Sequence, residues 1–239
     1  MPYEDILKRA EGHMTKKYDE QFEEAKAQGL SWYPWVGKEY SKTGILIVGM
    51  SAYYKEGADW SDEWRKFCDE DPRPNHVLVS ECLEDDRHKP FEAVAKMFIE
   101  KGADKNYEDT RKRFWSSVAF LNFCQKLVNG ASGPCNDSEH SRVALQKAIE
   151  IIKPKLVLAW TTQLWNVGFP WADDQERDKI GHDIPRVVAQ DPPVVGVLHP
   201  SWWVRGKDTG AKWLEFLCNE PLSKKPINDF LQHLNNTTK

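Results

Sequence analysis

Short apolar runs alternate with longer segments of helical periodicity, and this alternation constrains the fold more than any other feature. Runs of about four to six apolar residues predict buried strands at 45–48, 155–160, 186–189 and 194–198. Helical spacing predicts helices at 3–28, 62–68, 91–101, 108–129, 138–153, 208–218 and 226–234, whereas 75–83 fits either a strand or a helix. This alternation is typical of a mainly parallel sheet covered on both faces. We therefore predict an α/β fold of three layers, α/β/α, with a short, mainly parallel central sheet.

Length and composition favour one soluble domain. The 239 residues suit a single domain spanning 1–239, with a helical extension over about residues 1–30. Five cysteines without a CxxC pair predict free thiols and no zinc or iron–sulfur site. No run approaches the ~20 apolar residues that a membrane span needs. The net charge of −4 gives no global attraction to nucleic acid. We expect a cytoplasmic protein without a membrane partner.

Residues with chemical potential follow the predicted strands. In the stretch 194–206, the apolar run is broken by His199, Pro200 and Ser201, and Trp202 and Trp203 come next. A proline cannot donate to a sheet, so the strand ends there. Ligands of open α/β sheets bind at the carboxyl ends of strands. Two further stretches stand out, 49–54 after the first strand and 119–122 inside the predicted helix 108–129.

The order of these stretches resembles the uracil-DNA glycosylase superfamily. A strand, Gly49 and a turn with tyrosines come first, an apolar–Leu–Asn sequence ending at Asn122 comes second, and His-Pro-Ser at 199–201 comes last. The similarity covers about residues 32–206, and it is greatest to divergent bacterial members. It implies that fold and a monofunctional glycosylase, which flips out and excises a damaged or modified pyrimidine and leaves an abasic site. It also implies double-stranded DNA as the partner, no metal, no cofactor and a monomer.

The resemblance assigns a role to each matched residue. Asn122 would bind the flipped base, because an amide offers both a donor and an acceptor. His199 would stabilise the negative charge on the leaving base. The base pocket would also include Gly49, Met50, Tyr53 and Tyr54, and the DNA-binding residues would be Ser201, Trp202, Trp203, Arg205 and Lys207. One of the two tryptophans would fill the gap left by the flipped nucleotide.

Ser51 departs from the family pattern. It stands where members often carry Asp, Asn or Glu, and serine is a poor general base. Ser51 then only positions the water, or a carboxylate of the following insert (Glu56, Asp59 or Asp62) reaches the site, or the chain has lost activity. We count Ser51 and Asp59 among the candidate catalytic residues. The insert suits an enlarged pocket for a bulky phage base such as glucosylated hydroxymethylcytosine, which some bacterial relatives excise in antiviral defence.

Other functions stay open. A catalytically silent member of the same fold would bind DNA or a protein without cleaving it. A nucleotide- or small-molecule-binding α/β enzyme is a further alternative, although the chain has no GxGxxG or P-loop sequence. The candidate residues also have purely structural interpretations, since His199 can cap a loop, Asn122 can cap a broken helix, and Tyr53 and Tyr54 can serve as packing aromatics.

Overall fold

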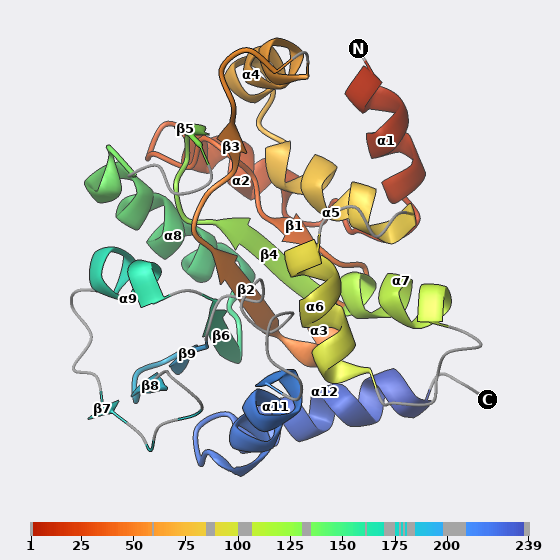
Figure 1. Ribbon diagram of the computed structural model, residues 1–239, viewed down its shortest axis with the longest axis vertical. Helices are drawn as coiled ribbons and strands as arrows, with labels where there is room; N and C mark the ends of the chain where they lie inside the picture. The colour runs from red at the N-terminus through yellow and green to blue at the C-terminus, as the bar shows by residue number, and fades with distance from the viewer. Residues whose placement is uncertain are drawn as a thin grey trace.

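A seven-stranded sheet lies at the centre of the molecule (Figure 1). The computed structural model describes residues 2–58, 60–84, 89–99, 107–130, 135–160, 162–169, 175–176, 178, 180, 185–197 and 209–236. The four middle strands are parallel, in the order β4 (Val118–Asn122), β2 (Ile45–Gly49), β6 (Leu156–Ala159) and β9 (Val194–Gly196). Antiparallel neighbours flank them, namely β1 (Trp35–Val36) beside β4 and β8 (Arg186–Val188) beside β9, with β7 (Gln175–Glu176) at the far edge.

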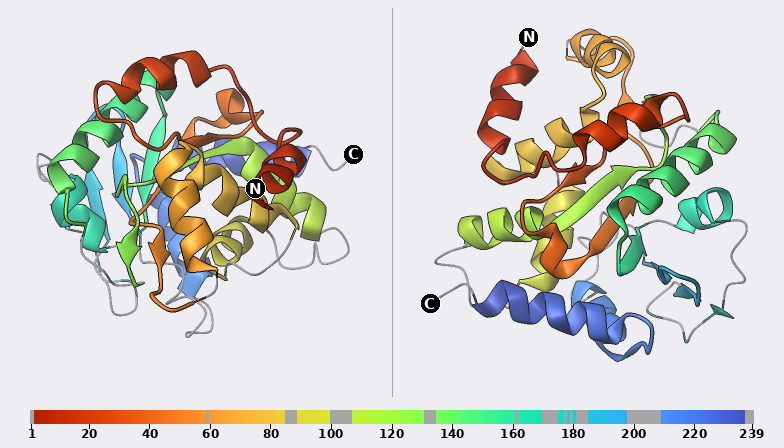
Figure 2. Two further views of the ribbon diagram at one scale, coloured as in Figure 1. Left: turned by 90° about the horizontal axis from the view of Figure 1, so that it is seen from above. Right: turned by 180° about the vertical axis from the view of Figure 1, so that it is seen from behind.

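Helices cover both faces of the sheet (Figure 2). One face packs against α5 (Pro74–Glu84), α6 (Lys89–Phe98), α7 (Tyr107–Ser117), α11 (Thr209–Asn219) and α12 (Lys224–Asn236). The other packs against α2 (Asp19–Lys26), α8 (Ser138–Ile152) and α9 (Thr162–Gly168). Within β2, Ile45 and Ile47 join the first apolar cluster, and Leu46 and Val48 join the second. Since a strand turns successive side chains to opposite faces, the sheet is buried on both, as predicted for a mainly parallel α/β fold.

A smaller unit lies beyond the end of β2. There β3 (Tyr53–Tyr54) pairs in parallel with β5 (Val128–Asn129), and the chain continues into α4 (Ser61–Glu70), at the top of Figure 1. Trp64 and Phe67 of α4 pack with Leu7 of α1 (Pro2–Ala10) and with Trp32 in a third apolar cluster. A short helix, α3 (Tyr40–Thr43), leads into β2.

The prediction of one long helix over 3–28 is wrong. The structure has two helices there, α1 and α2, separated by residues 11–18. The intervening backbone pairs with the start of the sheet instead: Met14 forms a β-bridge with Gly37, and the Thr15 amide donates to the Val36 carbonyl at 2.9 Å. The extension is therefore bound along the sheet edge.

The prediction of a helix over 108–129 is wrong beyond Ser117. The helix α7 ends there, and Val118–Asn122 form β4, all five residues buried between β1 and β2. Pairing on both sides satisfies this backbone as a strand. The ambiguous segment 75–83 is helical, within α5. The predicted strands at 45–48, 155–160, 186–189 and 194–198 are confirmed as β2, β6, β8 and β9, with ends that differ by one or two residues.

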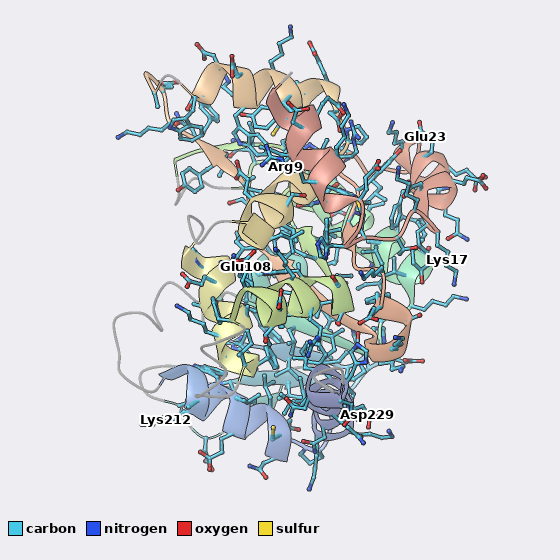
Figure 3. All side chains as sticks on the ribbon, turned by 90° about the vertical axis from the view of Figure 1, so that its right-hand side faces the viewer. Arg9, Lys17, Glu23, Glu108, Lys212 and Asp229 are labelled. Atoms are coloured by element: carbon cyan, nitrogen blue, oxygen red, sulfur yellow. The ribbon has the colours of Figure 1, made fainter. Side chains whose placement is uncertain are left out.

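Charged side chains cover the outside of the molecule. Those labelled in Figure 3 are all exposed: Arg9, Lys17, Glu23, Glu108, Lys212 and Asp229. Over the described ranges of the chain, no helix combines the length and the apolar character needed to cross a bilayer.

Candidate site at the carboxyl edge of the sheet

The four parallel strands end side by side at one edge of the sheet. Gly49 at the end of β2 pairs with Asn122 at the end of β4. On the other side of β2, the Trp160 amide donates to the Val48 carbonyl at 3.0 Å, and beyond it the Val197 amide donates to Ala159 at 2.8 Å. The chain runs from β2 outward to β4 and then returns across β2 to β6, so the order reverses between β2 and β6. Ligands of open α/β sheets bind at such a reversal.

Gly49 leaves room for two polar groups that converge above it. A Cβ atom at this position would lie 2.8 Å from Trp160 Nε1, 2.9 Å from Asn122 Oδ1 and 3.2 Å from Phe120 Cζ. The first two distances are shorter than real Cβ contacts allow. The Asn122 amide and the Trp160 indole therefore approach the end of β2 from either side, and only glycine permits both.

Aromatic rings form the wall beside this amide. The centroid of the Trp160 ring lies 5.2 Å from that of Phe120. It also lies 5.2 Å from the ring centroid of Phe91 in α6, in an edge-to-face arrangement. Trp160 is not among the site residues predicted from the sequence. The feature that could have identified Trp160 is its position directly after the buried run of β6, at the sheet edge where the other two motifs end.

Asn122 is held by two other buried amides. The Oδ1 atom of Asn75, in α5, accepts from the Asn122 backbone amide at 3.1 Å and from Asn122 Nδ2 at 3.2 Å. Gln125 Nε2 donates to the Asn122 carbonyl at 3.0 Å. Asn122 is 3 % exposed and Asn75 is 0 % exposed, so these bonds form out of water, where an unpaired amide is costly.

Asn75 and Gln125 are functional candidates that were not predicted from the sequence. Neither belongs to a motif, and Asn75 lay in the segment whose secondary structure was ambiguous. Asn122 itself does not cap a broken helix, since it ends a strand.

The stretches 49–54 and 122–130 run beside each other beyond the ends of β2 and β4. The Phe123 and Cys124 amides donate to the Gly49 and Met50 carbonyls at 2.8 and 2.9 Å. Farther along, Val128 donates to Ala52 at 3.1 Å. Gly49 faces Asn122 and Tyr53 faces Val128, so residues 123–127 lie opposite only residues 50–52. Residues 123–127 therefore form a bulge, and backbone hydrogen bonds join the two stretches on both sides of it.

Ser51 lies in the segment 50–52, opposite the bulge, and is half-buried. Among the residues that the structure describes, it has no hydrogen-bond partner. Glu56 and Asp62 of the insert are exposed, and neither hydrogen-bonds to Ser51. Asp59 lies outside the described residues. No described carboxylate therefore hydrogen-bonds directly to Ser51.

The other pocket candidates differ in exposure. Met50 is half-buried and packs against the cluster beneath α8. Tyr53 is 46 % exposed, whereas the Tyr54 ring is covered by the Arg65 guanidinium at 4.6 Å. Tyr53 is thus available for stacking, and Tyr54 is committed to a cation–π contact.

The second half of the predicted site lies outside the described residues, namely His199, Ser201, Trp202, Trp203, Arg205 and Lys207. The described chain reaches Val197, which is bonded to the end of β6. Val197 therefore ends this described range at the same sheet edge as Gly49, Asn122 and Trp160.

The described part of the site is uncharged. Asn75, Asn122 and Gln125 are neutral, and burial lowers the pKa of His76, the neighbour of Asn75, to about 3. The Cys135 pKa is lowered to about 6, chiefly by interaction with the Cys124 thiol, whose own pKa is raised. Within the described ranges, no three His, Cys, Asp or Glu side chains gather as they would to hold a metal ion.

No family model and no curated protein matches the chain.

Proposed function

We propose that this protein is a monofunctional DNA glycosylase, similar to the uracil-DNA glycosylase superfamily in fold and site. It flips a modified pyrimidine out of double-stranded DNA and cleaves its N-glycosidic bond. One observation carries the proposal: the buried Asn122 amide stands over Gly49 at the end of β2, the strand beside which the strand order reverses.

The chemistry of Asn122 fits a flipped base. Its Oδ1 atom accepts no hydrogen bond from any described residue, and Asn75 can occupy only one of the two Nδ2 hydrogens. An acceptor and a donor therefore stand next to each other, as the edge of a pyrimidine requires. The aromatic wall of Trp160 and Phe120 supplies the apolar surroundings in which such bonds discriminate most strongly.

In the proposed reaction, water attacks C1′ of the sugar and the bonding electron pair leaves with the base. Water supplies the hydroxyl that remains on the sugar, and its proton balances the charge of the departing base. Asn122 holds the base, and His199 retains its predicted role at the leaving group. Ser51 positions the water, since a neutral hydroxyl is a weak base.

The isolation of Ser51 from the described carboxylates favours one second candidate, a catalytically silent protein that binds DNA at the same edge. Duplexes that carry uracil, hydroxymethylcytosine or glucosylated hydroxymethylcytosine separate the two functions. After incubation and treatment with alkali, a glycosylase gives strand breaks at the modified position. A silent binder shifts the same duplexes and leaves them intact.

Asn122→Ala tests the site itself, with Asn129→Ala as its matched control. Asn129 is an exposed asparagine on β5, in the same stretch. We expect Asn122→Ala to lower the rate by about 100-fold, as loss of one essential hydrogen-bonding group does in other enzymes. Asn129→Ala should leave the rate unchanged. Intact strands on all three duplexes with the native protein would refute the glycosylase proposal.

A further inference from the structure

We propose that Asn75 is a positioning residue, which fixes the direction of the Asn122 amide and thereby decides which pyrimidine edge the site accepts. This inference rests on the proposed function, because it concerns what Asn122 binds. It starts from the two bonds that Asn75 Oδ1 accepts from the backbone and side chain of Asn122, at 3.1 and 3.2 Å.

The direction of the Asn75 amide is itself set. Asn75 Nδ2 donates to the Tyr33 carbonyl at 2.9 Å, so its Oδ1 atom has to face Asn122. An amide oxygen carries no hydrogen, and it can pair only with the Nδ2 side of Asn122. If the Asn122 amide turned over, two oxygens would face each other in a buried site. The turned state would lose the side-chain hydrogen bond and leave Asn122 Oδ1 unpaired against Asn75 Oδ1, which keeps only its bond from the Asn122 backbone amide.

This constraint leaves Asn122 Oδ1 on the side of Gly49, 2.9 Å from where a Cβ atom would stand. A uracil-type edge presents a carbonyl and an N–H, whereas a cytosine-type edge presents an amino group and a bare nitrogen at the same two positions. Donor and acceptor are therefore exchanged between the two edges. A fixed amide matches one edge and opposes the other, while a freely turning amide matches both.

Gln125 offers a matched control. It is as buried as Asn122 and also bonds to it, but its Nε2 atom donates to the Asn122 backbone carbonyl rather than to the side chain. Loss of Gln125 therefore perturbs the same turn without releasing the amide.

The test uses two duplexes that differ only in the edge of the target base, 5-hydroxymethyluracil and 5-hydroxymethylcytosine. We expect the native protein to release one base faster than the other. Asn75→Ala should move the ratio of the two rates about tenfold toward unity, because discrimination by a paired hydrogen-bonding edge is of this order or larger. Gln125→Ala should lower both rates together and leave the ratio unchanged. Asn75→Ser replaces Asn75→Ala where the alanine variant does not fold, since a hydroxyl both donates and accepts and permits either direction of the Asn122 amide.

Equal rates for the native protein, or an unchanged ratio in the Asn75 variant, would overturn the role of Asn75. If the native protein releases neither base, the side-chain amide signals of ¹⁵N-labelled protein decide on Asn75 alone, whereas the proposed function is still decided by the three duplexes named above. One Asn122 Nδ2 proton should be protected from exchange in the native protein and in Gln125→Ala, and unprotected in Asn75→Ala. Protection that persists in Asn75→Ala refutes the positioning role.

Discussion

Replacing Gly49 by alanine adds one methyl group at the point where the site is tightest. The new Cβ would lie 2.8 Å from Trp160 Nε1 and 2.9 Å from Asn122 Oδ1. Trp160 and Asn122 are each 3 % exposed, and Phe120, the third neighbour, is 0 % exposed. None of these side chains can turn into solvent, so the strand end or the site has to move.

Two effects set the change in the free energy of unfolding of the Gly49→Ala variant. Overpacking a buried site costs about 1–3 kcal/mol. Gly49 is not among the residues with positive φ, so alanine fits the backbone and recovers about 0.4–1 kcal/mol through the unfolded chain. We expect a net loss of about 1–2 kcal/mol in the free energy of unfolding. For a protein of this length, each kcal/mol lowers Tm by about 2–4 °C.

Urea unfolding followed by circular dichroism measures this loss, with Gly12→Ala as the control. Gly12 has no atom within 4 Å of its added Cβ, and its φ is not positive. That variant should therefore show the unfolded-state gain alone and be about 0.4–1 kcal/mol more stable than the native protein. Adding Asn122→Ala to Gly49→Ala removes one of the two closest contacts, so the two losses should sum to more than the loss of the double variant. A Gly49→Ala protein as stable as the native chain would refute the close approach at the end of β2.

Three further outcomes are expected. With its pKa near 6, Cys135 should lose about tenfold in alkylation rate between pH 7 and pH 5, rather than the ~100-fold of an ordinary thiol, by mass spectrometry; a hundredfold loss contradicts the lowered pKa. The folded His76 pKa of about 3 lies below its unfolded value of 6.5, so the unfolded chain takes up a proton as pH falls from 6.5 to 3, and stability declines by up to ~1.4 kcal/mol per pH unit. His76→Leu should flatten that slope in urea titrations at several pH values, and an unchanged slope counts against burial of the neutral ring. Trp60, which is 49 % exposed, should tolerate alanine within about 0.5 kcal/mol, whereas fully buried Trp115 should lose about 3–5 kcal/mol in the same assay; similar losses would be inconsistent with this difference in burial.

The sequence predicts strands well where the chain marks their ends. The run of β2 stops at Gly49, and the His-Pro sequence at 199–200 begins three residues after the end of β9. The start of β4 carries no such mark, because Ser117 passes into Val118 without a glycine or proline. Only its pairing with β2 and β1, both far away in the sequence, makes β4 a strand. A short apolar run alone does not distinguish a strand from a buried helix segment.

The site is predictable from sequence only in part, and for the same reason. Gly49 and Asn122 were identified from the order of their motifs, and the structure places them opposite each other. Asn75 matters through a hydrogen bond to a residue 47 positions away, and no local pattern reports such a contact. Trp160 matters because β6 returns to the far side of β2, which is a property of strand order rather than of composition.

The same strand order governs when the centre of the protein can form during synthesis. The two neighbours of β2 are β4 and β6, and Ile45 pairs with Leu156, which is made 111 residues later. At ribosomal rates of about 5–20 residues per second, the apolar strand β2 waits roughly 5–20 s for its second partner. During that interval its edge is open to other nascent chains. The exposure of β2 to aggregation is therefore greatest before the chain leaves the ribosome.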